Sequence, residues 1–389
     1  MPLYAGVFET DITPPHLVRM ASLRGGSASS LAIHDPLYAR ALVLDDGSVR
    51  LALISCDLYA LSTDGANGIR REIAAQIGTA REHVLIACSG NPHAPDTESE
   101  MADRPYIDVL QRKLWSAAVD AAHCLEPVHV TYGEASAQIG VACSGTEPDW
   151  HEPRPPDYSR AVAPHVQAIC VNGADGRLMA LLFGHACSAD LAADCDTISA
   201  GWPGAACAHL KSRFMREAAD SGVRPNALPL FLAGFGADVR PVRTDGWEAM
   251  AESGRQIGDA AHAARWNAHG RHTEVLAAGE APIAPPTAEA DSAAISWMRI
   301  GAVQLIAAPA PAVVALQLDI AAATAGQVLC VANANGSVRC LRDALAPPVK
   351  AGGPGVHDRT GEAETRRKAL DAFRAAIARA LGAGADTAC

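Results

Sequence analysis

The sequence predicts an α/β fold in which mixed β-sheets are flanked by helices. Apolar runs of strand length alternate along the chain with segments of helical periodicity. Two pairs of apolar runs are joined by Asp-Gly turns, which are typical of antiparallel hairpins. Other strands are followed by helical segments long enough to make parallel crossovers. Hairpins and crossovers in one chain predict sheets of mixed direction.

In the first half of the chain we expect a hairpin, a helix, a buried strand and a second helix, over residues 41–58, 63–78, 82–88 and 106–125. For the first helix, Thr63 or Asp64 is the predicted N-cap because short polar side chains accept from the first free N–H groups. Gly78 is its predicted C-terminal end.

In the second half we expect strands over residues 128–137, 228–238, 297–310 and 326–338 and a further hairpin over 166–187. Helices are expected over about 203–219 and over 361–382. Two segments rich in proline and acidic residues, 143–165 and 278–292, are predicted to be loops. Strand and helix patterns continue on both sides of them, so we expect one domain over residues 1–389.

Composition narrows the class of protein. With 49% hydrophobic residues, the 389-residue chain can bury a large core. A net charge of −11, without a dense Lys/Arg cluster, argues against a nucleic-acid partner. No apolar run approaches the roughly 20 residues that span a bilayer. The expected partner is a small-molecule ligand, and the chain could also form a homo-oligomer.

The N-terminus and the cysteines favour a cytoplasmic protein. The first residues have no basic segment followed by an apolar one, as a secretory signal would. The eleven cysteines show no CxxC or zinc-finger spacing. We expect most of them to be reduced and buried.

The residues at successive strand ends form a recognisable series. They read DITPP (11–15), IHDPLYARALVLDDG (33–47), ALISCDLYAL (52–61), ISAGWPG (198–204) and FLAGFGADVRP (231–241). In order and spacing they resemble the N-terminal domain of the neutral/alkaline ceramidase family, over nearly the whole chain. We expect no C-terminal immunoglobulin-like domain of the kind that longer ceramidases carry.

That resemblance implies a zinc-dependent amide hydrolase. In such an enzyme a zinc-bound water attacks the carbonyl of an N-acyl substrate. The family's metal ligands are two histidines, a glutamate and a tyrosine from four separate loops, and an arginine helps to hold the substrate.

This chain departs from the family at each of those positions. The residues that stand in for the four ligands are Gly90, Ser188, Ala310 (or Pro311) and Asn335 (or Ser337). Cys143 and Ser144 replace the arginines, and Arg240 stands where ceramidases have a serine. Because zinc needs about three protein donors, the resemblance implies a degenerate metal site, with no metal ligands and no cofactor.

The remaining chemical groups give two sets of candidates. The catalytic candidates are His93, His185 and Cys143. The pocket candidates are Asn91, Asp96, Ser144, Ser188, Asp238, Arg240, Asn335 and Cys340. For His93 a role as base, anion contact or relocated ligand stands beside a structural role in a tight proline-bounded loop. For His34 and Asp35 a structural role is favoured.

Two functions are therefore predicted, beside a purely structural or assembly role as a third alternative. The first is a ceramidase-like protein that works without metal, either as an enzyme or as a ligand-binding pseudoenzyme for a small polar molecule. The alternative is a zinc amide hydrolase with ligands relocated to His93, His185, Asp96 or Asp190, and a cysteine. Relocation requires at least three of these side chains to converge within about 2–2.5 Å of one point.

Overall fold

Strand β4 (Arg50–Cys56) is buried on both faces, because its apolar side chains enter two different cores. Ala52 and Ile54 pack under helices, whereas Leu51 and Leu53 pack toward a second sheet. Successive side chains of a strand point to opposite faces. A nearly continuous apolar run such as this one therefore belongs to a sheet that is covered on both sides.

β4 lies in an eight-stranded sheet with the order β11-β9-β8-β6-β1-β3-β4-β5. The pairs β4–β5 and β9–β11 are parallel and the others antiparallel, so the sheet is mixed, as predicted. The computed structural model describes residues 2–21, 29–143, 155–189, 196–221, 227–269, 275–285, 293–324, 327–338, 341 and 360–386. The other strands of the large sheet are β1 (Leu3–Asp11), β3 (Tyr38–Asp45), β5 (Val84–Cys88), β6 (Glu126–Ser136), β8 (His165–Gly173), β9 (Leu178–His185) and β11 (Leu228–Ala233).

Four helices cover one face of the large sheet. One core joins α1 and α2 to β3, β4 and β5, and another joins α3 and α4 to β8, β9 and β11. The helices are α1 (Thr63–Ile77), α2 (Arg104–His123), α3 (Gly201–Ser221) and α4 (Trp247–Trp266).

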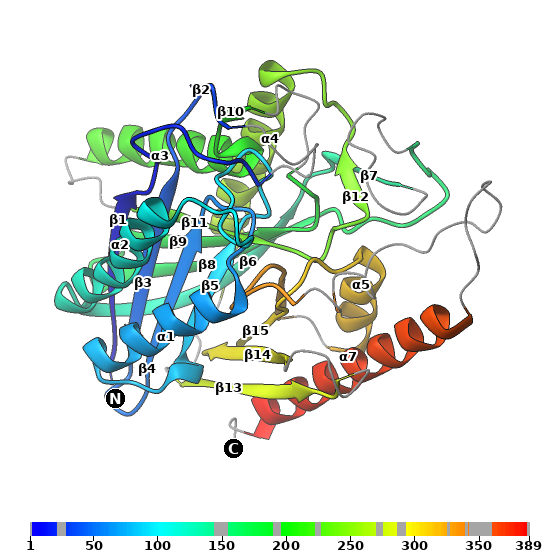
Figure 1. Cartoon of the computed structure of the whole chain (residues 1–389). Helices are drawn as coiled ribbons and strands as arrows, with labels where there is room; N and C mark the ends of the chain where they lie inside the picture. The colour runs from blue at the N-terminus through cyan, green and yellow to red at the C-terminus, as the bar shows by residue number, and fades with distance from the viewer. Residues whose placement is uncertain are drawn as a thin grey trace.

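A four-stranded sheet and two more helices cover the other face. The core between the sheets contains Leu53 and Leu232 from the large sheet, and Met298 and Leu305 from the small one. On the far side of the small sheet, α7 packs against β13 and β14 (Figure 1). These elements are β13 (Leu276–Ile283), β14 (Ala293–Ile300), β15 (Val303–Ala307), α5 (Val314–Ala323), β16 (Val328–Val331) and α7 (Thr360–Asp386). The result is four layers: helices, sheet, sheet, helices.

Two short strand pairs fasten the loops at the strand ends. β2 (Ala32–Ile33) pairs with β10 (Thr197–Ile198), directly before α3. β7 (Gly140–Ala142) pairs with β12 (Val239–Pro241), directly after the β11 loop. Segments far apart in the sequence are thereby held beside the ends of the main strands.

Most of the expected elements are confirmed, including both hairpins and the C-terminal helix. Two details are wrong. Residues 278–283 of the predicted loop 278–292 belong to β13, whose pairing with β14 outweighs the weak strand propensity of its sequence. The N-cap of α1 is Ser62, one residue before the predicted position, and its hydroxyl accepts from the N–H of Gly65 at 3.2 Å.

A buried group of charges ties β1, β3 and β4 to helix α3. The Arg40 guanidinium contacts Glu9 at 2.9 Å and both carboxylate oxygens of Asp57 at 3.2 Å. Lys211 of α3 holds the other oxygen of Glu9 at 2.6 Å. Burial by itself lowers the pKa of Arg40, but the charge of Asp57 above all outweighs it and leaves that pKa raised. Arg40 therefore stays charged inside the fold.

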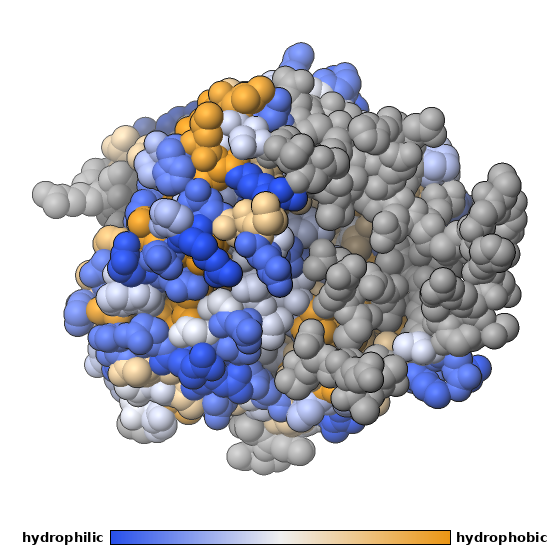
Figure 2. All heavy atoms as spheres, viewed as in Figure 1, coloured by the Kyte–Doolittle hydropathy of each residue, from blue (hydrophilic) through white to orange (hydrophobic). Residues whose placement is uncertain are grey.

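The visible surface of the described residues is mainly hydrophilic, with small apolar areas between (Figure 2). No helix in the described part of the chain is long and apolar enough to cross a bilayer.

Candidate functional site: the strand-end junction

The first position of interest is the turn after β5. Gly90 has φ 74°, a left-handed conformation that suits glycine. A Cβ at this position would lie only 2.7 Å from the side-chain nitrogen of Asn333. A histidine at this place, where the family resemblance puts a zinc ligand, would need both a left-handed backbone and a shift of the Asn333 side chain.

The next residues, Asn91 to His93, are fastened to the loop before α3. Asn91 is fully buried; its side-chain oxygen Oδ1 accepts from the His93 N–H at 3.1 Å, and its side-chain nitrogen donates to the Ser199 backbone carbonyl. The Ser199 N–H donates in turn to the His93 carbonyl at 3.1 Å. The His93 ring is 3% exposed and meets Trp247 edge-on at 5.6 Å. His93 is thus held in place within the protein rather than presented to solvent.

The second ligand position, Ser188, lies beyond the end of β9. Its N–H donates to the Val239 carbonyl at 2.8 Å, and its carbonyl accepts from the Trp202 indole at 2.9 Å. Trp202 is fully buried. Its hydrogen bond brings the start of α3 against the β9 loop.

His185, the last residue of β9, is 3% exposed and faces the interior. Its Nδ1 lies 3.2 Å from the His165 carbonyl, and its ring meets Trp202 edge-on. Burial lowers the pKa of His185 to about 4, although the bond to His165 opposes that shift. The ring is therefore neutral at neutral pH and carries its proton on Nδ1.

This histidine should make the fold sensitive to acid. Its pKa is about 4 when folded, against 6.5 for an ordinary histidine, so the unfolded chain binds more protons between these pH values. The stability is complete above about pH 6.5 and falls by about 3 kcal/mol as the pH drops to about 4. We expect urea unfolding of His185→Gln to lose less stability over this range than the parent protein. Equal slopes for His185→Gln and the parent would contradict this assignment.

The third position, Ala310, is buried, and its carbonyl accepts from the Asn333 N–H at 3.3 Å. The Asn333 carbonyl accepts from the Cys88 N–H at 3.1 Å. The loops after β15, β16 and β5 therefore meet at Asn333, the residue whose side chain lies against Gly90.

The fourth position, Asn335, uses both ends of its amide inside the fold. Its oxygen accepts from the Ile86 N–H and its nitrogen donates to the Ser296 hydroxyl, both at 2.8 Å. Its backbone is left-handed, with φ 59°, which asparagine tolerates better than most residues. Asn335 thus ties the loop after β16 to strand β5.

We call this meeting point the strand-end junction. It consists of the ends of β5, β9, β15 and β16 and the start of α3, with residues Gly90, Asn91, His93, Ser188, Ser199, Gly201, Trp202, Ala310, Asn333 and Asn335. Hydrogen bonds and close contacts therefore link the loops that carry the four positions assigned to zinc by the resemblance.

Asp238 and Cys143 form a neighbouring cluster. The fully buried Asp238 carboxylate accepts from the Val314 N–H at 2.7 Å and from the Arg160 guanidinium. Arg160 also donates to the Cys143 carbonyl at 2.8 Å, and the Cys143 N–H donates to the Asp238 carbonyl at 2.8 Å. A guanidinium thus lies beside the position where the resemblance expects an arginine. No sequence motif singles out Arg160.

Four more pocket candidates lie outside the junction or outside the described residues. The Asp96 carboxylate accepts from the Ser99 N–H at 3.0 Å and pairs with Arg19 at 3.3 Å. Arg240 is half-buried on β12, where it donates to the Pro241 carbonyl at 3.1 Å. Ser144 and Cys340 are outside the described residues.

The donor set does not fit zinc. Of the four family positions, Gly90 has no side chain, Ser188 has a hydroxyl and Ala310 has a methyl group. The amide of the fourth, Asn335, is already hydrogen-bonded at both ends. Among the residues described, no three or more His, Cys, Asp or Glu side chains are grouped to hold a metal ion. Of the relocated ligands, Asp190 is outside the described residues. No reaction step through a zinc ion follows from these groups.

The structure also joins residues that the sequence left apart. The His34 ring stacks on Trp247 with centroids 4.2 Å apart, and its Nδ1 lies 2.6 Å from the Asp35 carboxylate. Asp35 accepts from the Ser199 hydroxyl and from the Ala200 N–H, both at 2.6 Å. This group therefore lies against the junction, at the first turns of α3 and α4.

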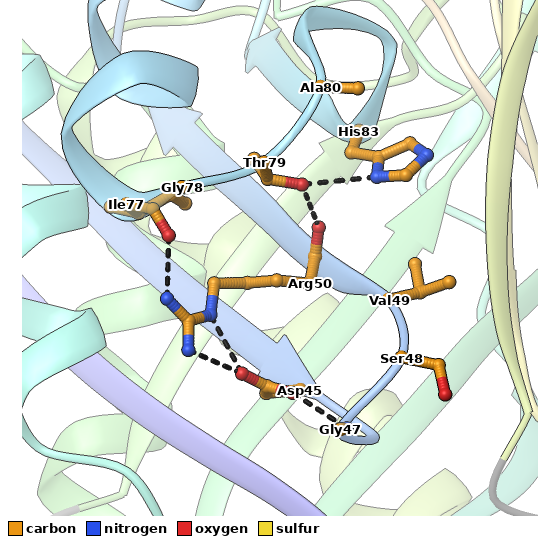
Figure 3. Close-up of a pocket in the computed structure, with 10 residues that line it drawn as sticks. All are labelled: Asp45, Gly47, Ser48, Val49, Arg50, Ile77, Gly78, Thr79, Ala80 and His83. Carbon is orange, nitrogen blue, oxygen red and sulfur yellow. Dashed lines mark hydrogen bonds and ion pairs between the residues drawn. The ribbon is translucent and has the colours of Figure 1, made fainter.

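A separate cavity of about 510 Å³ lies at the opposite end of β4, against the β3–β4 turn and the end of α1 (Figure 3). Its cation is already paired, since Arg50 donates to Asp45 at 2.7 Å and to the Ile77 carbonyl at 2.6 Å. Thr79 bridges the Arg50 carbonyl and His83. None of the predicted site residues lines this cavity.

Comparison with known proteins supports the fold. No protein-family model and no curated protein sequence matches the chain. The solved structure of neutral ceramidase from Pseudomonas aeruginosa superposes with a TM-score of 0.73 and 15% identity, covering 98% of this chain and 75% of that one. A ceramidase complexed with C2 gives a TM-score of 0.71 and 15% identity, covering 97% and 75%. The ceramidase-like α/β fold expected from the strand-end motifs is thus confirmed.

Proposed function

We propose that this chain uses a ceramidase fold without zinc chemistry, and that its strand-end junction takes a small polar molecule. The main support for this proposal is the set of side chains at the four family positions. Gly90 is the clearest case, because the Asn333 side chain lies where a side chain of residue 90 would begin. Function depends on the residues of a site rather than on the fold that bears them. In this proposal the chain is either a metal-independent hydrolase of an amide or related bond or a ligand-binding pseudoenzyme.

Polar groups around the junction support the choice of a polar ligand. Asn333 is half-buried, and no hydrogen bond of its side-chain amide is found among the described residues. Ser188 is also half-buried and lies beside the start of α3. The half-buried Asn333 amide favours a ligand with hydrogen-bonding groups.

The relocated-ligand alternative has less support. The Asp96 carboxylate is already bound to Ser99 and Arg19. A metal-binding carboxylate would instead leave its oxygens directed toward the metal and its other ligands. Among the described residues, no three His, Cys, Asp or Glu side chains are grouped so that they could hold a metal ion.

Metal content distinguishes the two proposals. In protein purified without a histidine tag or chelator, we expect elemental analysis to find well under one zinc per chain, because the donor set is inadequate. Added zinc should not raise the melting temperature, as a ligand that binds the folded state would. About one zinc per chain would overturn the proposal. Alanine substitution of His93 and His185 would then show whether either is a relocated ligand.

The cytoplasm is the proposed location. Seven cysteines in the described part of the chain, Cys187 not counted, form no disulfide, and six of these seven are buried. Unpaired thiols are typical of a reducing compartment.

A further inference from the structure

We propose that His34 is the proton-accepting group of the strand-end junction, that Asp35 and Trp247 position it, and that it serves the metal-free hydrolysis of a small ester or amide. This inference rests on the proposed function and adds a catalytic residue and a substrate class to it.

The hydrogen bond to Asp35 selects one form of the His34 ring. An ionised carboxylate can only accept a hydrogen bond, so Nδ1, at 2.6 Å from Asp35, carries the proton. The lone pair of the neutral ring is then on Nε2. No hydrogen bond to this Nε2 is found among the residues that the structure describes.

The carboxylate that selects this form is itself held from two sides. Its second oxygen accepts from the Ala200 N–H, and the oxygen that meets His34 also accepts from the Ser199 hydroxyl. These bonds lie immediately before Gly201, the first residue of α3. The N-terminal end of a helix favours a negative charge. Asp35 is therefore a fixed partner for His34 rather than a flexible surface carboxylate.

Stacking fixes the plane of the His34 ring. The ring lies 4.2 Å from Trp247 at an interplanar angle of 15°, and the same indole meets His93 edge-on. Trp247 is the first residue of α4, so its position is set by a helix that packs along α3. Orientation of this kind is what a general base needs before a substrate arrives.

Exposure separates His34 from the histidines that the sequence favoured. The His34 side chain is 37% exposed, whereas His93 and His185 are each 3% exposed. A base must come within hydrogen-bond reach of the proton that it removes. His34 can meet a ligand at the outer side of the junction without any rearrangement of the core.

Other histidine–carboxylate pairs of the chain are arranged differently. His16 meets Asp103, and His209 meets Asp259, through Nε2 in both cases. In these two pairs Nε2, the ring nitrogen farther from the backbone, is occupied by the carboxylate. His34 is bound through Nδ1 and leaves the outer nitrogen available.

The proposed reaction uses water as its only co-reactant. His34 Nε2 takes a proton from a water molecule while the water oxygen forms a bond to the acyl carbon. The carbon–oxygen or carbon–nitrogen bond to the leaving group then breaks, and the proton passes from the imidazolium to that group. The products are a carboxylic acid and an alcohol or amine.

The test measures hydrolysis of two acyl probes, 4-nitrophenyl acetate and 4-nitroacetanilide, by the full chain in buffer with EDTA. We expect the parent protein to hydrolyse at least one probe faster than buffer does. His34→Gln should lower kcat about 100-fold or more, in line with the usual contribution of a general base. Asp35→Asn should lower kcat with little change in KM, because it affects orientation rather than binding. His16→Gln, at the pair bound through Nε2, is the matched control and should keep the parent rate.

A structural readout accompanies the rates. Nitrogen NMR should find the neutral His34 ring protonated on Nδ1 in the parent protein and shifted toward the Nε2-protonated form in Asp35→Asn. Thermal unfolding shows whether each variant is folded, and His34→Asn replaces His34→Gln if the latter is not.

Each outcome has one meaning. A rate that is unchanged in His34→Gln, or a parent protein that does not exceed buffer, overturns the role of His34 but leaves metal-free ligand binding intact. A rate that EDTA abolishes and zinc restores overturns the proposed function itself.

Discussion

Replacement of Asp57 by Asn should lower the free energy of unfolding by about 3–5 kcal/mol, the usual cost of removing one partner from a buried ion pair. The side chains of Arg40 and Asp57 are 3% and 2% exposed. Without the Asp57 charge, two cations, Arg40 and Lys211, would share the single carboxylate of Glu9. The Tyr38 N–H, which now donates to Asp57 at 2.9 Å, would also lose an ionised acceptor. Urea unfolding followed by tryptophan fluorescence measures the change.

The control for this prediction is an ion pair at the surface. Arg243 and Asp245 form a comparable contact at 3.1 Å, but their side chains are 56% and 69% exposed. Solvent screens such pairs, so Asp245→Asn should leave the urea midpoint unchanged within error. Equal effects of the two substitutions would show that the Arg40 group is not sealed from water.

Gly6→Ala should also be strongly destabilising, by about 3 kcal/mol or more, at the upper end of what overpacking usually costs. Gly6 lies on β1 where α2 crosses it, and an added Cβ would be only 2.0 Å from the carbonyl oxygen of Ala121. The obstacle is backbone, so no side-chain rotation relieves it. Strand and helix would have to separate.

Gly68→Ala provides a matched control within helix α1. An added Cβ there meets nothing within 4 Å. Since alanine favours a helix over glycine by about 1 kcal/mol, this variant should be slightly more stable than the parent. Thermal unfolding of both variants tests the pair. A loss in Gly68→Ala as large as in Gly6→Ala would rule out the close β1–α2 contact as the cause.

The likeness to ceramidases and the altered donor set are compatible, because a fold and the site that it carries change separately. The hydrogen bonds that join the strand ends run mostly between backbone atoms, as from Ala332 to Ala233 and from Cys88 to Asn333. Such bonds persist when side chains are exchanged. The junction can therefore keep its shape whichever side chains stand at positions 90 and 310.

Sequence reasoning was least successful where packing overrides local preference. Helix α4 was not predicted, because many of its buried positions are alanine, glycine or serine and give a weak apolar pattern. These small residues are needed for close contact with α3, as at Gly254, where an added Cβ would be 2.5 Å from Ala205. In β13, Glu280 reads as a loop residue, yet it binds Arg70 at 2.6 Å and Arg81 at 2.7 Å.

By itself, the sequence determined the main strands, the hairpins and which residues stand at the strand ends, because hydrophobic periodicity and turn chemistry are local. The absence of zinc donors at Gly90, Ser188 and Ala310 is a matter of residue identity and needed no structure once the resemblance had assigned the positions.

Only the tertiary structure decided which polar groups meet. Ser199 reaches Asp35 across 164 residues, and Arg160 reaches Asp238 across 78. Such contacts depend on how sheets and helices stack, and no local pattern in the sequence encodes that stacking. For that reason the base that we propose is the exposed His34, and not the buried His93 that stood among the candidates from the sequence.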